Sequence, residues 1–176
     1  MNTGIGGSQA TAVLASLIEG ESKDTAAMVD KMREDYQVKL AELTLSSNAK
    51  SANVTVTTES EDPRAQQMAK DLQALWYRRL KDILDCIAYG RVAFEKVWEY
   101  DMRANANVLA DLLPLPYSQT DMVLEEGVFN GVEVKGKKKS DSVTLDPEHS
   151  WWLALDAKPL NPYGTSRFQG APNKKY

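Results

Sequence analysis

The 176-residue sequence predicts an α+β fold, in which long amphipathic helices pack on small antiparallel β-sheet or hairpin elements. Two long segments in the first half of the chain have apolar residues at helical spacing. The second half contains short runs of alternating β-branched and aromatic residues, separated by turn signals. Hydrophobic residues make up 43% of the chain and charged residues 26%, which is ordinary for a globular domain.

The first segment, residues 1–22, is rich in Gly, Ser, Ala and Thr. This composition predicts a flexible N-terminal arm ahead of one domain at residues 23–176. The longest uncharged apolar stretch, near Thr11–Ile18, is too short to span a bilayer. We therefore expect no membrane partner.

The first predicted helix covers residues 24–45, with Asp24 as its N-cap. Its apolar residues recur at steps of three and four and would form one stripe. After a break at Ser46, Ser47 and Asn48, residues 53–58 alternate β-branched side chains and predict a strand. The stripe consists of Val29, Met32, Tyr36, Leu40 and Leu43.

The strongest helix signal covers residues 63–88. Asp62 would cap it and Pro63 would occupy its first turn, where a missing N–H costs nothing. Gly90 is placed to end the helix in a left-handed conformation. One continuous apolar stripe runs along the helix: Ala65, Met68, Ala69, Leu72, Leu75, Trp76, Leu80, Ile83, Leu84 and Ile87.

A strand at residues 91–100 is predicted directly after Gly90. Residues 101–120 are weakly patterned, and residues 112–117 read as an extended connection. Because strand neighbours alternate between the two faces, one face of the predicted strand carries Val92, Phe94, Trp98 and Tyr100, and the other carries Ala93, Glu95, Val97 and Glu99.

The last third of the chain predicts a hairpin over residues 122–135. Asn130-Gly131 is the dipeptide preferred in two-residue type I′ turns, so we expect the turn there. Short strands at residues 142–145 and 150–155 follow, with a turn at Asp146-Pro147 between them. Residues 161–164 form a further turn, and a short helix is expected through Arg167-Phe168.

Trp151-Trp152 is the first candidate interaction feature. Neighbours on a strand point to opposite faces, so one ring would face a core and the other must face something else. An exposed Trp is a suitable anchor for a protein partner. The alternative is that a helix and a loop of the same subunit cover both rings.

Four lysines around Gly136 form the second candidate feature: Lys135, Lys137, Lys138 and Lys139. Such a cluster favours weak contact with phosphates, and the alternative is a solvated loop between strands. The net charge of the chain is −4, with 25 acidic and 21 basic side chains. We therefore expect any DNA contact to be transient and non-specific.

No catalytic constellation is evident. The chain has a single cysteine, Cys86, which excludes an intrachain disulfide. One cysteine and one histidine, His149, also argue against a zinc site. Glu125 and Glu126 would point to opposite faces of a strand and could not act as a pair. The sequence contains neither a GxSxG nor an HExxH motif. We predict a protein that is not an enzyme and has no cofactor or metal.

Two segments, in this order, carry a family resemblance. Residues 87–98 read I-A-Y-G-R-V-A-F-E-K-V-W, a helix end, a Tyr89-Gly90 corner and a strand that contains Phe94, Glu95 and Trp98. Residues 161–168 read N-P-Y-G-T-S-R-F, the turn Asn161-Pro162-Tyr163-Gly164 followed by a small residue and a basic–apolar pair. The pair resembles the Mu-like portal proteins of tailed bacteriophages, over roughly residues 24–172.

The resemblance implies a wing-like portion of a portal subunit. Portal subunits form a ring, usually of twelve, at one capsid vertex, and DNA is packaged and ejected through the ring. The implied partners are further copies of the chain, the major capsid protein, the terminase, and neck or adaptor proteins. The implied location is the virion, with assembly in the host cytoplasm.

Portal subunits of this family are longer than this chain. The part after the Pro-Tyr-Gly turn supplies the stem and the clip. We therefore expect the chain to correspond to the N-terminal portion, ending before the stem. The alternative function is a stand-alone virion adaptor or interaction module without a DNA channel.

Overall fold

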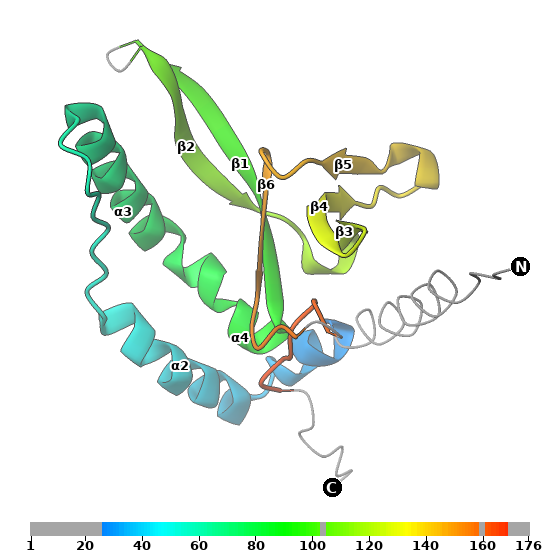
Figure 1. Ribbon diagram of the computed structural model, residues 1–176. Coiled ribbons are helices and arrows are strands. Elements are labelled where there is room, and N and C mark those ends of the chain that lie inside the picture. Colours follow the sequence, from blue (N-terminus) through cyan, green and yellow to red (C-terminus); the bar gives the residue numbers. More distant parts are fainter. Residues whose placement is uncertain (1–25, 103–104, 159–160, 169–176) are drawn as a thin grey trace, which may run out of the picture.

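The computed structural model describes residues 26–102, 105–158 and 161–168. The long helix of residues 63–84 lies along one three-stranded antiparallel sheet, the helix of residues 36–51 lies away from that sheet, and a second three-stranded sheet lies beside the first (Figure 1). The predicted α+β class is confirmed. The predicted arm at residues 1–22 lies outside the described residues.

The predicted helix at residues 24–45 is divided into two parts. Residues 26–32 are helical, a turn follows at residues 33–35, and α2 is Tyr36–Ser51. Asp35 caps α2, and its carboxylate accepts a hydrogen bond from the Gln37 backbone N–H at 2.7 Å. The turn separates the two halves of the predicted stripe. Val29 is fully buried, whereas Tyr36 and Leu40 at the start of α2 are exposed.

The predicted strand at residues 53–58 is wrong. These residues are extended, but within the described part of the chain they pair with no strand. Side chains of the following helix satisfy part of their backbone instead. Val54 N–H donates to the Tyr77 hydroxyl at 2.8 Å, and Val56 N–H donates to Gln73 Oε1 at 3.2 Å. Helix side chains thus take the place of a neighbouring strand.

The long helix is α3, Pro63–Leu84, followed after Asp85 by the short α4, Cys86–Tyr89. The Asp62 carboxylate accepts from the Arg64 N–H at 2.8 Å, as expected of an N-cap. Gly90 ends α4 with φ +83°, and its N–H donates to the Cys86 carbonyl at 2.8 Å. The predicted left-handed glycine is confirmed.

The first sheet has the order β2-β1-β6, with β1, Arg91–Asp101, at its centre. β2, Ala106–Pro114, and β6, Ser150–Ala154, both pair antiparallel to β1. The side of the sheet that faces α3 forms the main core. Its buried members are Leu75, Ile83, Phe94 and Leu112, with half-buried Trp76, Val92, Leu109, Trp151 and Leu153 packed against them.

The sequence did not predict β2. The register with β1 shifts at Val97/Trp98, and Ala110 is left without a partner residue. This bulge places Leu109 and Leu112, three residues apart, in the same core. Strand prediction relies on a spacing of two, so the bulge hides the pattern.

The second sheet is the meander β3-β4-β5. It consists of β3, Thr120–Glu125, β4, Val128–Val134, and β5, Val143–Leu145; the short helices η1, Tyr117–Gln119, and η2, Lys139–Asp141, precede β3 and β5. The second sheet is thus built from a hairpin and one added short strand.

The predicted hairpin is present, but its predicted turn at Asn130-Gly131 is wrong. The turn residues are Glu126 and Gly127, with φ of +52° and +83°. Gly131 lies inside β4, where a Cβ atom would be 2.0 Å from the Leu145 carbonyl oxygen. Close approach of β5 therefore explains this glycine.

The described C-terminal residues, 161–168, form turns, and the rest of the short helix predicted through Arg167-Phe168 lies outside the described residues. Ser166 Oγ accepts from the Phe168 N–H at 3.0 Å, the bond that a helix N-cap makes. Phe168 is buried with Val29 and Ala88 in a second, smaller core. This core joins the C-terminal turns to α4 and to the helical residues 26–32.

Candidate functional site

The two sequence motifs meet at one place in the fold. Gly90, at the end of α4, lies against the turn that contains Gly164. A Cβ atom on Gly90 would lie 2.7 Å from the Ser166 backbone nitrogen, and one on Gly164 would lie 2.5 Å from the Gly90 carbonyl oxygen. Both glycines also have positive φ, +83° and +75°. We call Gly90, Gly164 and their contacts the glycine corner.

Main-chain hydrogen bonds fix the glycine corner. The Leu155 N–H donates to the Gly90 carbonyl at 2.7 Å, and the Thr165 N–H donates to the Leu155 carbonyl at 2.8 Å. The Arg167 N–H donates to the Ile87 carbonyl at 3.0 Å. The Ser166 hydroxyl donates to the Ala88 carbonyl. The end of β6, α4 and the C-terminal turn are therefore joined chiefly through their backbones.

Arg91, next to the corner, is buried in an aromatic cage. Its side chain lies over the rings of Tyr117 and Tyr163, each 4.6 Å from the guanidinium carbon, and of Trp152 at 5.1 Å. The residue is only 2% exposed, and burial lowers the pKa of its guanidinium. The negative ring faces compensate part of the lost hydration.

The cage also connects the two sheets. Arg91 Nη2 lies 3.9 Å from an Asp121 carboxylate oxygen and 3.4 Å from the Thr120 carbonyl oxygen, both at the start of β3. Asp121 in turn forms an ion pair with Lys135, which follows β4. Sequence reasoning gave Arg91 no individual role. The sequence signal that could have identified Arg91 is its position, because it is a charged residue between a left-handed glycine and a strongly apolar strand.

Tyr89 connects the corner to the N-terminal helices. Its ring stacks on Tyr117 with centroids 4.7 Å apart, and its hydroxyl donates to Asp30. Arg33 Nη1 donates to the same hydroxyl at 3.2 Å. Arg33 also pairs with Glu42 of α2 and, at 2.7 Å, with Asp85. The hydrogen bond with Glu42 is the main reason why the pKa of Arg33 is raised.

The other predicted motif residues on β1 lie away from the corner. Phe94 is fully buried in the main core and stacks on Trp151 with centroids 5.4 Å apart. Glu95 is half-buried opposite Leu113 of β2. Trp98 is 42% exposed, and its indole N–H donates to the Glu148 carbonyl at 3.1 Å. These residues build the sheet.

In the Asn161–Gly164 turn, the remaining residues hold the loop closed. The Asn161 side-chain amide donates to the Gly164 carbonyl at 2.9 Å, and the Gly164 N–H donates to the Asn161 carbonyl at 3.3 Å. Pro162 lies in the turn, and Tyr163 points its ring at Arg91. The turn motif therefore ends in the Arg91 cage.

Both rings of Trp151-Trp152 have partners inside the subunit. Trp151 packs in the main core, and Trp152 meets Tyr163 edge to face with centroids 5.7 Å apart. Both residues are half-buried. These contacts favour cover within the subunit, and a role as a partner anchor stays a prediction.

The structure separates the lysine cluster. Lys135 is ion-paired with Asp121 and belongs to the junction between the sheets. Lys137 and Lys138 are exposed in the following loop, and Lys139 begins η2. A phosphate contact by this loop stays a prediction.

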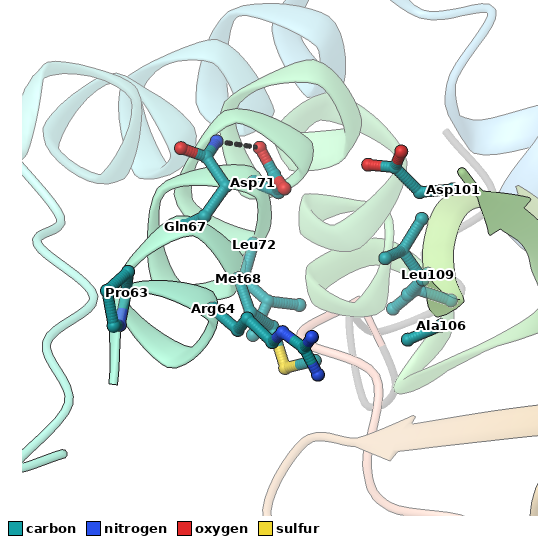
Figure 2. A pocket seen from close by; sticks show the side chains of 10 residues that line it. Pro63, Arg64, Gln67, Met68, Asp71, Leu72, Asp101, Ala106 and Leu109 are labelled. Atoms are coloured by element: carbon teal, nitrogen blue, oxygen red, sulfur yellow. Dashed lines mark hydrogen bonds between the residues drawn. The ribbon is translucent and has the colours of Figure 1, made fainter. Parts of the chain in front are cut away.

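A cleft of about 530 Å³ lies between the N-terminal half of α3 and the β1–β2 hairpin (Figure 2). Met68, Leu72 and Leu109 give it an apolar floor. Charged side chains of Asp71 and Asp101 also line it, as does Arg64. The sequence did not indicate this cleft, because β2 was not predicted.

The described residues bring together no group of three or more His, Cys, Asp or Glu side chains that could hold a metal ion. Cys86 is buried, and burial raises the pKa of its thiol. His149 pairs at 2.9 Å with Asp146 in an exposed turn. Of the helices in the described ranges, none is long and apolar enough to cross a membrane.

The family model for the portal protein of Mu bacteriophage matches residues 26–171. This range contains both motif segments, the glycine corner and all of the helices and strands described above. No curated protein matches the sequence.

Proposed function

The chain belongs to the family of Mu bacteriophage portal proteins, and on this premise we propose that it is a structural subunit, or a fragment of a subunit, of a portal or head–tail connector ring. The ring would sit at the capsid vertex through which DNA is packaged and ejected. The observation that carries this proposal is the family match over residues 26–171. The chain would act by assembly and not by catalysis.

The glycine corner supports a structural role. A subunit that repeats around a ring must keep a constant angle between its helices and its sheets. Gly90 and Gly164 bring backbones into contact where a side chain would not fit. The Arg91 cage then joins β1 to the C-terminal turn and to the start of β3. Together these contacts hold the elements in one arrangement.

Exposed apolar side chains support assembly with protein partners. Tyr36, Leu40 and Leu43 are exposed on α2, and Met68 is exposed on α3. Large apolar side chains exposed on two surfaces are what contacts between proteins would cover. We propose further copies of the chain, the major capsid protein, the terminase, and neck or adaptor proteins as partners. Assembly would take place in the host cytoplasm, and the product would be part of the virion.

DNA contact in this role is transient and non-specific. The net charge of −4 disfavours strong attraction to phosphates. Exposed Lys137 and Lys138 are the candidates for weak phosphate contact. Such contact would weaken strongly as salt rises, and a tight, sequence-selective complex at physiological salt would contradict the proposal.

Mass measurement in solution, by native mass spectrometry and sedimentation, tests the proposed ring. We expect the 176-residue chain to form a closed oligomer, visible as rings by electron microscopy. A monomer that binds a capsid or neck protein would instead support the stand-alone adaptor. A monomer without either activity would contradict both functions.

A further inference from the structure

The α2 helix exposes an apolar stripe. Tyr36, Leu40 and Leu43 are 76%, 50% and 57% exposed. Their spacing of i, i+4 and i+7 places them on one face of the helix. The stripe borders the packed side of α2, because buried Ser46 lies one turn after Leu43, and Leu43 lines a small pocket together with Leu84 of α3. We call Tyr36, Leu40 and Leu43 the α2 stripe.

The cleft between α3 and the β1–β2 hairpin offers a complementary surface. Met68 and Leu72 in its floor are 51% and 37% exposed. Methionine adapts its shape to a partner more readily than branched residues do. The volume of about 530 Å³ can accept several side chains. Figure 2 shows Met68 and Leu72 on the α3 side and Leu109 on the hairpin side.

We propose that the α2 stripe of one subunit binds the α3–hairpin cleft of the next copy of the chain. The inference rests on the proposed ring function and names its contact surfaces. An amphipathic helix that lays anchors at i, i+4 and i+7 into an apolar groove is a common mode of recognition. The α2 stripe has that spacing, and the cleft has the required apolar floor.

Charge supports the pairing. Lys39 is exposed on α2, three residues after Tyr36 and four before Leu43, so it lies beside the α2 stripe. Lys50 is also exposed, further along the helix. The cleft is lined by Asp71 and Asp101 against a single base, Arg64. A helix with a basic flank thus meets a cleft with an acidic surplus.

The two surfaces lie at opposite ends of α3. Residues that lead into α2 pair with the C-terminal end of α3 through Arg33 and Asp85, whereas the cleft lies at its N-terminal half (Figure 1). Contact between copies is therefore head to tail. A head-to-tail contact leaves one α2 stripe and one cleft open at the ends of a chain of subunits until a ring closes.

Three variants test the contact. Leu40→Asp places a charge in the middle of the α2 stripe, and Met68→Asp places a charge in the apolar floor of the cleft. Leu45→Asp is the matched control, because Leu45 is also exposed on α2 but lies nine residues after Tyr36, on the opposite face. We expect assembly of the parent and of Leu45→Asp, and at least about a tenfold weaker association for each of the other two. Far-UV circular dichroism should show all four folded.

A mixing experiment identifies the direction of the contact. The Leu40→Asp chain keeps its cleft, and the Met68→Asp chain keeps its α2 stripe. An equimolar mixture should form one-to-one heterodimers and nothing larger, since the remaining surfaces are both disabled. In the same assay, Lys39→Asp should weaken association, and adding Asp71→Lys to it should restore part of the loss.

Three outcomes would overturn the inference. If the parent assembles and Leu40→Asp and Met68→Asp assemble equally well, the ring function stands and these surfaces are not the contact. If the mixture forms larger species, the contact is not head to tail. If the parent is monomeric and Leu40→Asp lowers its melting temperature, the stripe packs against its own chain, and the ring proposal fails separately through the missing oligomer.

Discussion

The two ends of α3 differ although one apolar pattern runs through both. In the C-terminal half, Leu75, Leu80 and Ile83 are buried, the first and last of them in the main core. In the N-terminal half, Met68 and Leu72 remain exposed in the cleft. The apolar periodicity of a helix therefore indicates which residues favour burial, but not whether the residues that bury them belong to the same subunit. We call the C-terminal half of α3 the closed end and its N-terminal half the open end. We infer that the closed end stabilises the fold and that the open end makes the assembly contact.

The largest expected loss in the free energy of unfolding is for a substitution at the glycine corner, which supports the closed end. Gly90→Val would place a β-branched residue at φ +83° and a Cβ atom 2.7 Å from the Ser166 nitrogen. Backbone strain and overpacking each cost on the order of 1–3 kcal/mol, so we expect a loss of about 4 kcal/mol in the free energy of unfolding. Denaturant titration measures it.

Gly90→Ala is the companion variant. Its Cβ atom meets the same backbone, so it should also destabilise, by on the order of 2 kcal/mol, but less than valine does. A parent-like midpoint for Gly90→Val would show that the corner relaxes easily. The physical reason for the Tyr89-Gly90 motif would then be lost.

A matched pair of leucines compares the two ends of α3 directly. Leu75 is 3% exposed and Leu72 is 37% exposed, one turn apart. Leu75→Ala should cost about 3 kcal/mol, as in other tightly packed cores, and Leu72→Ala about 1 kcal/mol or less. Leu72→Ala should instead weaken association. Equal losses of stability would contradict the distinction between the ends.

The sequence predicted well wherever one local rule decided the structure. The caps at Asp62 and Gly90 were predicted because a side-chain oxygen or a missing Cβ acts within one turn of helix. β1 and β6 were predicted from alternation. The glycine corner joins residues more than seventy positions apart in the sequence. No local spacing relates its two motifs, and only the family resemblance linked them.

The misses have physical reasons as well. The bulge at Ala110 concealed β2, and without β2 the cleft had no second wall. The glycine of Asn130-Gly131 serves the approach of β5 and not a turn. Residues 53–58 have strand-like side chains, but Tyr77 and Gln73 of α3 satisfy part of their backbone. Each outcome depends on a distant segment that local patterns do not report.

Loss of the ion pair between α3 and β2 should have a moderate effect on the free energy of unfolding. Arg79 Nε and Nη2 lie 2.9 Å and 2.5 Å from the two carboxylate oxygens of Asp111. The hydrogen bond with Arg79 lowers the pKa of Asp111 below its ordinary value. The pair belongs to the closed half of the interface, where the helix still contacts the sheet. Asp111→Asn should cost about 1 kcal/mol at neutral pH.

The pH dependence of that cost has a definite sign. A carboxyl group whose pKa is lower in the folded state contributes stability that is present above its ordinary pKa of about 4. This stability is lost as the pH falls through the folded-state value. The difference between the parent and Asp111→Asn should therefore be largest near pH 7 and shrink towards zero in acid. A difference that grows in acid would contradict the assignment.

The smallest expected effect concerns the segment that leads into the open end. The Tyr77 hydroxyl accepts from the Val54 N–H at 2.8 Å and donates to the Val54 carbonyl at 3.2 Å. Tyr77→Phe removes both bonds, but the site is exposed and water can replace them, so the global loss should be about 0.5 kcal/mol. The local effect should be larger, because the hydroxyl satisfies both backbone groups of Val54. Hydrogen exchange should therefore quicken at the Val54 amide while the amides of β1 stay protected. If β1 exchange quickens equally, the segment is part of the closed core, and the boundary between the two ends of α3 lies nearer the N-terminus than the burial of its leucines indicates.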